Sequence, residues 1–364
     1  MHISRRSVLL STLLTAVPEI TRAQESVQIE RDYWPTQRWK IDAPANQKVD
    51  GDLLSEADKL IAGAMPDVTG FVVVRGGYIV HEHYFGDRYG RSDPVKIRSI
   101  TKSVVGTLIG IALSDGYLSS LDQTLGELIP DQIPSDADPF TESITVRNLL
   151  TMTSGWSWDI ATDYERLISS DNWLAYTLGQ PVSYSPGTFF AYNSGGSHVL
   201  SVILTQVTGM DTADYAQERL FTPLGIARPT WQRSPQGETV GGFGLELTPR
   251  NVAKLGFLYL NDGLWDGEQI VPADYVEQAT SYQSEGDSTG YAAYGYQWWI
   301  SQPEGIPSYF GLGFVGQYLY VIPDRDLVVV VLKGFDETPA IIGAPRPMIE
   351  SVVINAATPK TPVG

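Results

Sequence analysis

The chain of 364 residues contains no cysteine and only four histidines. Without thiols it can form no disulfide, no cysteine nucleophile and no cysteine-ligated metal site. Neither a His-Glu-x-x-His sequence nor a Walker motif occurs, so the usual signatures of zinc proteases and of phosphate-binding loops are missing. The Gly-x-Ser-x-Gly elbow of α/β-hydrolases is absent as well. If the protein is an enzyme, its nucleophile must stand in another sequence context.

Basic residues are also scarce, with 25 Lys and Arg against 42 Asp and Glu, which gives a formal net charge of −17. An acidic surface repels nucleic acid and anionic lipid, so we expect neither as a partner. Apolar residues make up 43% and charged residues 18%, proportions typical of a folded globular protein. The length suggests two domains, or one large domain with an insertion.

Residues 1–23, "MHISRRSVLLSTLLTAVPEITRA", are predicted to be an export signal. Arg5-Arg6 precede an apolar run, and a cleavage-like stretch ends before Gln24. Paired arginines followed by Ser-Val-Leu-Leu are typical of a twin-arginine signal; an ordinary secretory signal is the alternative. The apolar run is shorter than a spanning helix requires. We therefore expect a periplasmic or secreted mature chain without a membrane anchor.

Local patterns predict strands near both ends of the chain. "GFVVVRGGYIVHEHYF" contains two β-rich runs joined by Gly76-Gly77, which predicts a hairpin. Apolar residues at helical spacing over 100–113 predict a buried helix, and Thr248-Pro249 predicts the start of another. Strand-like patterns return in "YGYQWWI", "GIPSYFGLG", "GQYLYVI" and "LVVVVLKGF", and "GAPRPMIESVVINAA" is typical of a closing helix.

The segment between these ends contains short helical patterns and no convincing strand. Such segregation predicts an α+β fold, an antiparallel β-sheet flanked by helices with an all-helical inserted region. We expect residues 24–117 and 241–364 to form the sheet domain and residues 118–240 the helical region. A small-molecule site is expected in the cleft between them.

Two histidines, His81 and His83, alternate within "GYIVHEHYF", with Glu82 on the opposite face of the expected strand. Two histidines on one strand face can bind a metal, but the strand offers no carboxylate on that face. We therefore predict no metal site, and we expect His198, which lies in a helical pattern, to be a packed or partly exposed residue.

The stretch "KIRSITKSVVGTLIG" places Ser99 and Lys102 three residues apart at the mouth of the predicted helix. Residues i and i+3 share a helix face, so the Lys102 amine should lie within reach of the Ser99 hydroxyl. A serine hydroxyl needs a base to become a good nucleophile, and burial lowers the pKa of lysine toward neutrality. The pair can therefore supply a nucleophile and its base.

Two later stretches strengthen this interpretation. "SPGTFFAYNSGGSHVLSVIL" contains Tyr192-Asn193-Ser194, and "YFGLGFVGQYLYVIPDRDLVVVVL" contains Gly311-Leu312-Gly313 on an expected strand. With Ser99-x-x-Lys102, in this order, they resemble the three motifs of the serine β-lactamase and penicillin-binding protein superfamily. "PGTFFAYNSG" and "GFVGQYLYVIPDRDLVVV" resemble its class C-like esterases and amidases, in particular the 6-aminohexanoate-dimer hydrolases. The resemblance covers most of the mature chain and implies a β-lactamase/transpeptidase-like fold.

The resemblance also implies roles for individual residues. Ser99 matches the acylated nucleophile, Lys102 its proton acceptor, and Tyr192 the tyrosine that relays the proton to the leaving group. The oxyanion hole would consist of the backbone N–H groups of Ser99 and Phe314, which would stabilise the tetrahedral intermediate.

Four further residues are implied as substrate-side groups: Asn193, Ser194, Gly311 and Gly313. Two of them depart from the family pattern. Ser194 stands where the middle motif often has Asn, and Gly311 stands where β-lactamases have Lys or His. The second difference argues against β-lactam substrates and favours neutral esters or amides.

The sequence therefore predicts an exported serine hydrolase that cleaves an ester or small linear amide without a cofactor. Two alternatives remain open. One is a β-lactamase or D-amino-acid peptidase acting on cell-wall-type substrates, and the other is a non-catalytic β-lactam-binding sensor. We expect a monomer or homodimer whose partner is its small-molecule substrate.

Overall fold

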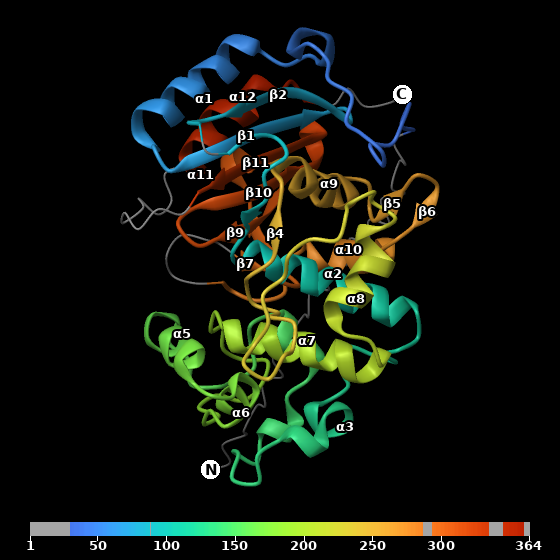
Figure 1. The fold of residues 1–364 in the computed structure, drawn as a ribbon, viewed down its shortest axis with the longest axis vertical. Helices are drawn as coiled ribbons and strands as arrows, with labels where there is room; N and C mark the ends of the chain where they lie inside the picture. Colours follow the sequence, from blue (N-terminus) through green and yellow to red (C-terminus); the bar gives the residue numbers. More distant parts are fainter. Residues whose placement is uncertain (1–29, 88, 287–292, 335–344, 360–364) are drawn as a thin grey trace, which may run out of the picture. The chain divides into compact units, whose positions relative to one another are not determined.

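A seven-stranded antiparallel sheet is the central element of the computed structural model, which describes residues 30–87, 89–286, 293–334 and 345–359 (Figure 1). The export signal predicted for residues 1–23 lies outside these ranges. The strand order is β2-β1-β11-β10-β9-β8-β7. The strands are β1 (Val68–Arg75), β2 (Tyr78–Tyr84), β7 (Ala293–Tyr294), β8 (Trp299–Ser301), β9 (Ser308–Gly313), β10 (Gln317–Ile322) and β11 (Leu327–Lys333).

Two short ribbons lie outside this sheet. The first pairs β3 (Val95–Lys96) with β4 (Glu246–Leu247), and the second pairs β5 (Leu264–Trp265) with β6 (Glu268–Gln269). The predicted hairpin is confirmed: β1 and β2 are joined by Gly76 and Gly77, whose φ angles of 59° and 86° suit a tight turn.

α-Helices occur throughout the described part of the chain. They are α1 (Gly51–Ala64), α2 (Ile100–Ser114), α3 (Leu125–Leu128), α4 (Val146–Leu150), α5 (Ile160–Ser169), α6 (Trp173–Leu178), α7 (Ser194–Thr208), α8 (Thr212–Ala216), α9 (Pro249–Leu260), α10 (Ala273–Ala279), α11 (Pro345–Met348) and α12 (Ile354–Ala356). Turns of π-helix follow α8 at Gln217–Phe221 and join α11 to α12 at Ile349–Val353. Single 3₁₀ turns occur at Pro44–Gln47, Pro130–Gln132, Thr141–Ser143, Pro303–Gly305 and Pro323–Arg325.

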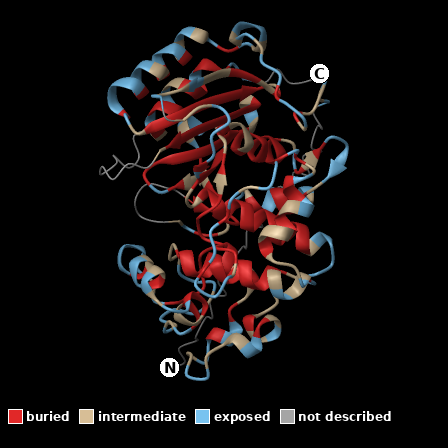
Figure 2. Ribbon diagram, viewed as in Figure 1, coloured by how far each residue is buried: buried red, intermediate tan, exposed pale blue. Residues whose placement is uncertain are grey.

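Helices cover both faces of the sheet. On one face α1 and the segment α11–α12 bury apolar side chains such as Leu54, Ile61 and Ile349. On the other face α2 and α9 contribute Val104, Leu108 and other side chains to the larger core. Figure 2 shows the strands β1, β9, β10 and β11 and the helix α2 almost wholly buried. The edge strand β2 is only partly buried, and α1 presents an exposed outer side. This arrangement confirms the predicted α+β class, with an antiparallel sheet flanked by helices.

The predicted helix at 100–113 is confirmed as α2, and 13 of its 15 residues are buried. It lies between β9 and α7, since it contacts both. The helix predicted after Thr248 is also confirmed, because the Thr248 side chain accepts a hydrogen bond from the Asn251 N–H and Pro249 takes the first position.

One strand prediction is wrong in part. "YGYQWWI" contains the end of β7 and most of β8 rather than one strand. Gln297 interrupts it with a φ of 62°, and its side-chain amide donates to the carbonyls of Leu149 and Leu150, each at 3.0 Å. These buried hydrogen bonds replace sheet pairing at this position.

The segment expected to be all-helical contains α3 to α8, and the larger sheet takes no strand from its described residues. Residues Arg31–Gly364 cluster as one compact unit. Among the described residues, no helix combines the length and the apolar character needed to cross a membrane.

Candidate active site

Lys102 is the centre of a buried hydrogen-bond group. Its Nζ lies 2.9 Å from Ser99 Oγ, 3.1 Å from Ser194 Oγ and 2.8 Å from the carbonyl oxygen of Gly242. These partners come from the start of α2, the start of α7 and the loop before β4. The structure therefore brings the first two motifs together at one amine.

Burial changes the acid–base properties of this amine. Lys102 is 1% exposed, and loss of hydration lowers its pKa from 10.5 to about 7. At neutral pH a substantial fraction of Lys102 is therefore neutral, with a lone pair that can face the Ser99 hydroxyl. A neutral amine at 2.9 Å from a hydroxyl can accept its proton.

A second buried lysine shows why the partners of Lys102 matter. Lys254 donates to the carbonyl oxygens of Thr36, Leu224 and Gly225 at 3.0, 2.8 and 3.1 Å, and burial lowers its pKa to about 8. Carbonyls only accept hydrogen bonds, so Lys254 has no proton to take from them. Two of the three partners of Lys102 are hydroxyls, which can donate a proton as well as accept one.

Ser99 stands at the N-cap of α2, but its side chain makes no capping hydrogen bond. Its hydroxyl is instead directed to Lys102. Arg98, just before it, has a φ of 52°, a conformation that costs an L-residue about 1 kcal/mol or more. The chain therefore enters α2 through a strained turn that presents Ser99 at the helix mouth.

Asn193 and Ser194 have different positions in the site. The Asn193 side chain caps α7 by accepting from the Gly196 N–H at 2.9 Å, so α7 begins at Ser194. Ser194 is 2% exposed and its hydroxyl contacts Lys102. Ser194 thus lies against the lysine, and the side-chain oxygen of Asn193 is used within the protein.

Gly242 was missed by sequence reasoning, because a backbone carbonyl carries no side-chain signal. A Cβ at Gly242 would lie 2.7 Å from the carbonyl oxygen of Ser194, so only glycine lets this loop approach α7 closely enough to reach Lys102. The Gly241-Gly242 pair in "TVGGFG" is the signal that could have indicated such a close approach.

Tyr192 lies beside the same amine. Lys102 Nζ is 4.9 Å from the centroid of the Tyr192 ring, and the ring stacks on Trp299 with centroids 5.5 Å apart. Tyr294 contacts it edge-on at 6.2 Å. Two aromatic residues from the far end of the sheet therefore fix the ring of Tyr192 at the site.

The third motif occupies the end of β9, where Gly311 and Gly313 let the strand approach α2. A Cβ at Gly311 would lie 3.1 Å from Ser103 Oγ, and one at Gly313 would lie 2.7 Å from the carbonyl oxygen of Ile97. Both glycines therefore serve close packing. Gly313 in particular brings the end of β9 against the turn that carries Ser99.

Phe314 follows directly and is 60% exposed. Val315 after it has a φ of 66°, which is unusual for a β-branched residue. Strained backbone therefore flanks both of the residues predicted to form the oxyanion hole, Arg98 before Ser99 and Val315 after Phe314. Such strain persists only where surrounding packing holds it, and it is common at functional sites.

An antiparallel sheet with a Ser-x-x-Lys pair at the mouth of a buried helix defines a class of protein, the serine hydrolases of the β-lactamase fold. The chain belongs to the beta-lactamase family, whose model matches residues 57–339. It is thus a hydrolase of this fold, related to 6-aminohexanoate-dimer hydrolases and penicillin-binding proteins.

Two relatives and one solved structure show what the chain is similar to. The 6-aminohexanoate-dimer hydrolase of Paenarthrobacter ureafaciens is 24% identical over 291 residues, which cover 73% of this chain and 72% of that protein. Penicillin-binding protein 4 of Amycolatopsis lactamdurans is 26% identical over 278 residues, covering 65% and 71%. The solved structure of a putative 6-aminohexanoate-dimer hydrolase from Bacillus anthracis is 23% identical, with a TM-score of 0.69, and the match covers 82% of this chain and 80% of that one.

Proposed function

We propose that this protein is an exported serine hydrolase that cleaves esters or small linear amides through an acyl-Ser99 intermediate. The observation that carries the proposal is the buried Lys102 amine, 2.9 Å from Ser99 Oγ, with its pKa lowered by burial to about 7. A nucleophile and a base of suitable pKa at hydrogen-bond distance are the minimal requirement for acyl transfer.

In the proposed acylation, Lys102 takes the Ser99 proton as Ser99 Oγ attacks the substrate carbonyl carbon. The carbonyl oxygen becomes an oxyanion, which the N–H groups of Ser99 and Phe314 would stabilise, each by about 3–4 kcal/mol. When the intermediate collapses, the bond to the leaving alcohol or amine breaks. Tyr192 delivers its phenolic proton to the leaving group and regains one from Lys102, so the amine is neutral again.

Deacylation reverses these roles with water as the nucleophile. Tyr192 and Lys102 take a proton from water as it attacks the acyl carbonyl. The bond to Ser99 Oγ breaks, Oγ takes back the proton that Tyr192 and Lys102 accepted from water, and the carboxylic acid leaves. Ser194 and Gly242 supply hydrogen-bond partners that hold the Lys102 amine in place, so we assign them as positioning residues.

The direct test is hydrolysis of p-nitrophenyl acetate and butyrate across pH by the wild type, Ser99→Ala and Lys102→Ala. Both variants should lose about 10³-fold or more in kcat/KM. The exposed Lys59→Ala variant controls for loss of a positive charge and should retain activity. In the wild type, kcat/KM should fall on the acid side of pH 7, because protonated Lys102 cannot act as base. Turnover that survives Ser99→Ala would contradict the nucleophile assignment.

A cell-wall peptidase or β-lactamase is the second candidate. Against it stands Gly311, because this position of the third motif, where β-lactamases have Lys or His, carries no side chain. A Cβ here would point at Ser103 and Ile100 of α2. Rapid turnover of a β-lactam would favour this candidate. A stable mass increase on Ser99 without turnover would favour a sensor.

The substrate class is tested by a panel in which the linear dimer of 6-aminohexanoate and short alkyl esters are compared. Cleavage of the dimer at a rate comparable to esters would place the chain with the amidases, and cleavage of esters alone would place it with the esterases. Export is tested by fractionation of cells that express the full chain or its Arg5→Lys, Arg6→Lys variant. Twin-arginine transport predicts that only the full wild-type chain reaches the periplasm or medium.

A further inference from the structure

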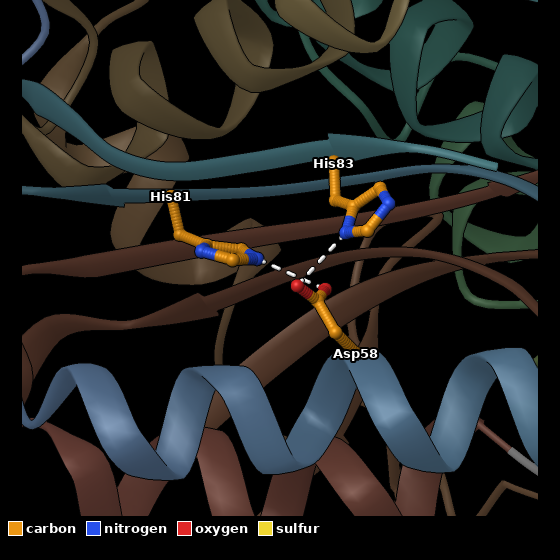
Figure 3. Close-up of side chains that lie close together, drawn as sticks. All are labelled: Asp58, His81 and His83. Carbon is orange, nitrogen blue, oxygen red and sulfur yellow. Dashed lines mark hydrogen bonds and ion pairs between the residues drawn. The ribbon is translucent and has the colours of Figure 1, made fainter.

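Three side chains converge on the face of the sheet that α1 covers, as Figure 3 shows. Asp58 projects from α1, and His81 and His83 project from β2. Asp58 Oδ1 lies 3.0 Å from His81 Nε2, and Asp58 Oδ2 lies 2.8 Å from His83 Nδ1. One carboxylate thus contacts two imidazoles.

The strand and helix patterns explain this convergence. His81 pairs with Val73 and His83 with Phe71 across the β1–β2 ladder, and both partners belong to the core beneath α1. The same-face prediction for the two histidines is therefore confirmed. The premise that no carboxylate would lie near them is wrong, because α1 supplies Asp58 from 23 residues earlier in the chain.

The cluster has the ligand chemistry of a transition-metal site. Its candidate ligand atoms, two imidazole nitrogens and one carboxylate oxygen, all lie within 4.8 Å of one another. A tetrahedral zinc ion with bonds of about 2.0–2.2 Å requires ligand atoms roughly 3.3–3.5 Å apart. The two hydrogen-bonded separations of 2.8 and 3.0 Å, which involve different oxygens of Asp58, need to open by a few tenths of an ångström. The widest separation among the ligand atoms, at most 4.8 Å, needs to close by up to about 1.3 Å, which rotation of the exposed His83 side chain can supply.

The surroundings favour binding as well. The side chains of His81 and Asp58 are 18% and 20% exposed, and that of His83 is 46% exposed, so an ion can enter and water can complete its coordination. Phe85 stacks on the His83 ring with ring centroids 4.2 Å apart. The ring centroids of Phe71 and His81 are 5.2 Å apart. These aromatic contacts restrict the ring orientations before any ion binds.

A bound metal ion would take the place of the hydrogen bonds that join Asp58 to His81 and His83. Each imidazole can stay neutral when it binds a metal by carrying its proton on the other ring nitrogen.

We propose that Asp58, His81 and His83 form a binding site for a divalent transition-metal ion, with zinc as the representative ligand. Two imidazoles and a carboxylate match the preferences of zinc, nickel and copper rather than those of calcium or magnesium. The site lies on the opposite face of the sheet from α2, so the ion takes no part in chemistry at Ser99. It links α1 to β2 and stabilises the folded state, since it binds the folded chain and the unfolded chain lacks the site.

The test is isothermal titration of the untagged, chelator-treated full chain with zinc chloride. The wild type should bind one equivalent and gain thermal stability with rising zinc. His83→Gln and Asp58→Asn should each weaken binding by about tenfold or more, because each removes one of three protein ligands. Bound Co²⁺ should show the visible absorption of a nitrogen- and oxygen-ligated site, and this absorption should be lost in the same variants.

Two control variants separate this site from others. Asp52→Asn removes an exposed carboxylate from the same helix, and His2→Gln removes a histidine from the predicted signal; both should bind zinc within twofold of the wild type. His83 is the most exposed of the three ligands, so His83→Gln should fold normally. This variant therefore tests the proposed zinc site even if Asp58→Asn folds poorly. No saturable binding at about 1 mM zinc, or equal binding by the wild type and His83→Gln, would overturn the proposal.

Discussion

Replacement of Lys102 by methionine should abolish hydrolysis and change the pH dependence of stability in a defined way. In the unfolded chain this lysine has an ordinary pKa of 10.5, and in the folded protein burial lowers it to about 7. Between these values the unfolded state binds a proton that the folded state lacks, so wild-type stability rises with pH across this window. At about 1.4 kcal/mol per pH unit, the whole window is worth roughly 5 kcal/mol.

Below pH 7 the wild type carries a buried charge and has lost this contribution. Methionine is of similar length and apolar, so Lys102→Met removes the cost of the buried charge. It also removes three hydrogen bonds, each worth about 1 kcal/mol. The variant should therefore be more stable than the wild type by about 2 kcal/mol at pH 6, and less stable by about 2 kcal/mol at pH 10. The two stability curves should cross between about pH 8 and 9.

The assay is denaturant-induced unfolding of both proteins from pH 6 to 10, compared as a difference so that other titrating groups cancel. Ser99→Ala is the matched control, because it is also inactive but keeps the buried amine. Its stability should rise with pH as in the wild type. Parallel curves for the wild type and Lys102→Met would refute the conclusion that Lys102 titrates near pH 7.

Three further substitutions test the surroundings of the amine. Ser194→Ala removes a hydroxyl that stabilises the charged form of Lys102, so the acid limb of the pH profile of kcat/KM should move to lower pH by about half to one unit. Ser201→Ala removes another buried hydroxyl from α7 and should leave the acid limb in place. A shift of the acid limb to higher pH in Ser194→Ala would contradict the assignment. Gly313→Ala would place a Cβ 2.7 Å from the carbonyl oxygen of Ile97 and should lower kcat about 10- to 100-fold with less change in KM; unchanged kinetics would show that the end of β9 can shift freely. Asn193→Ala removes the N-cap of α7 and should lower the free energy of unfolding by about 1 kcal/mol, measured by thermal unfolding. Asn193→Asp keeps a capping oxygen and should retain the wild-type stability.

Much of the fold could be predicted because its signals are local. The β1–β2 hairpin depends on Gly76-Gly77, α2 on apolar spacing over 100–113, and α9 on Thr248-Pro249. Each of these patterns lies within about 15 neighbouring residues. The interruption of "YGYQWWI" by Gln297 could not be predicted in this way, because it depends on carbonyls of α4 nearly 150 positions earlier.

In the candidate site, too, contacts between near neighbours in the sequence could be predicted and contacts between distant residues could not. Ser99 and Lys102 share one helix turn, so their contact follows from spacing alone. The contacts of Lys102 with Ser194 and Gly242 span 92 and 140 positions and depend on how three elements pack. The position of Asp58 over His81 and His83 likewise follows from the docking of α1 on the sheet, which no strand pattern reveals.

The burial of α2 has a consequence for how the protein opens. Because 13 of its 15 residues are inaccessible and it contacts both β9 and α7, the helix cannot detach without disrupting the sheet and the helical segment together. Its amide protons should therefore exchange with solvent only when the whole unit unfolds. We therefore expect the contact between Ser99, at the N-cap of this helix, and Lys102, within it, to be lost only in the cooperative unfolding transition.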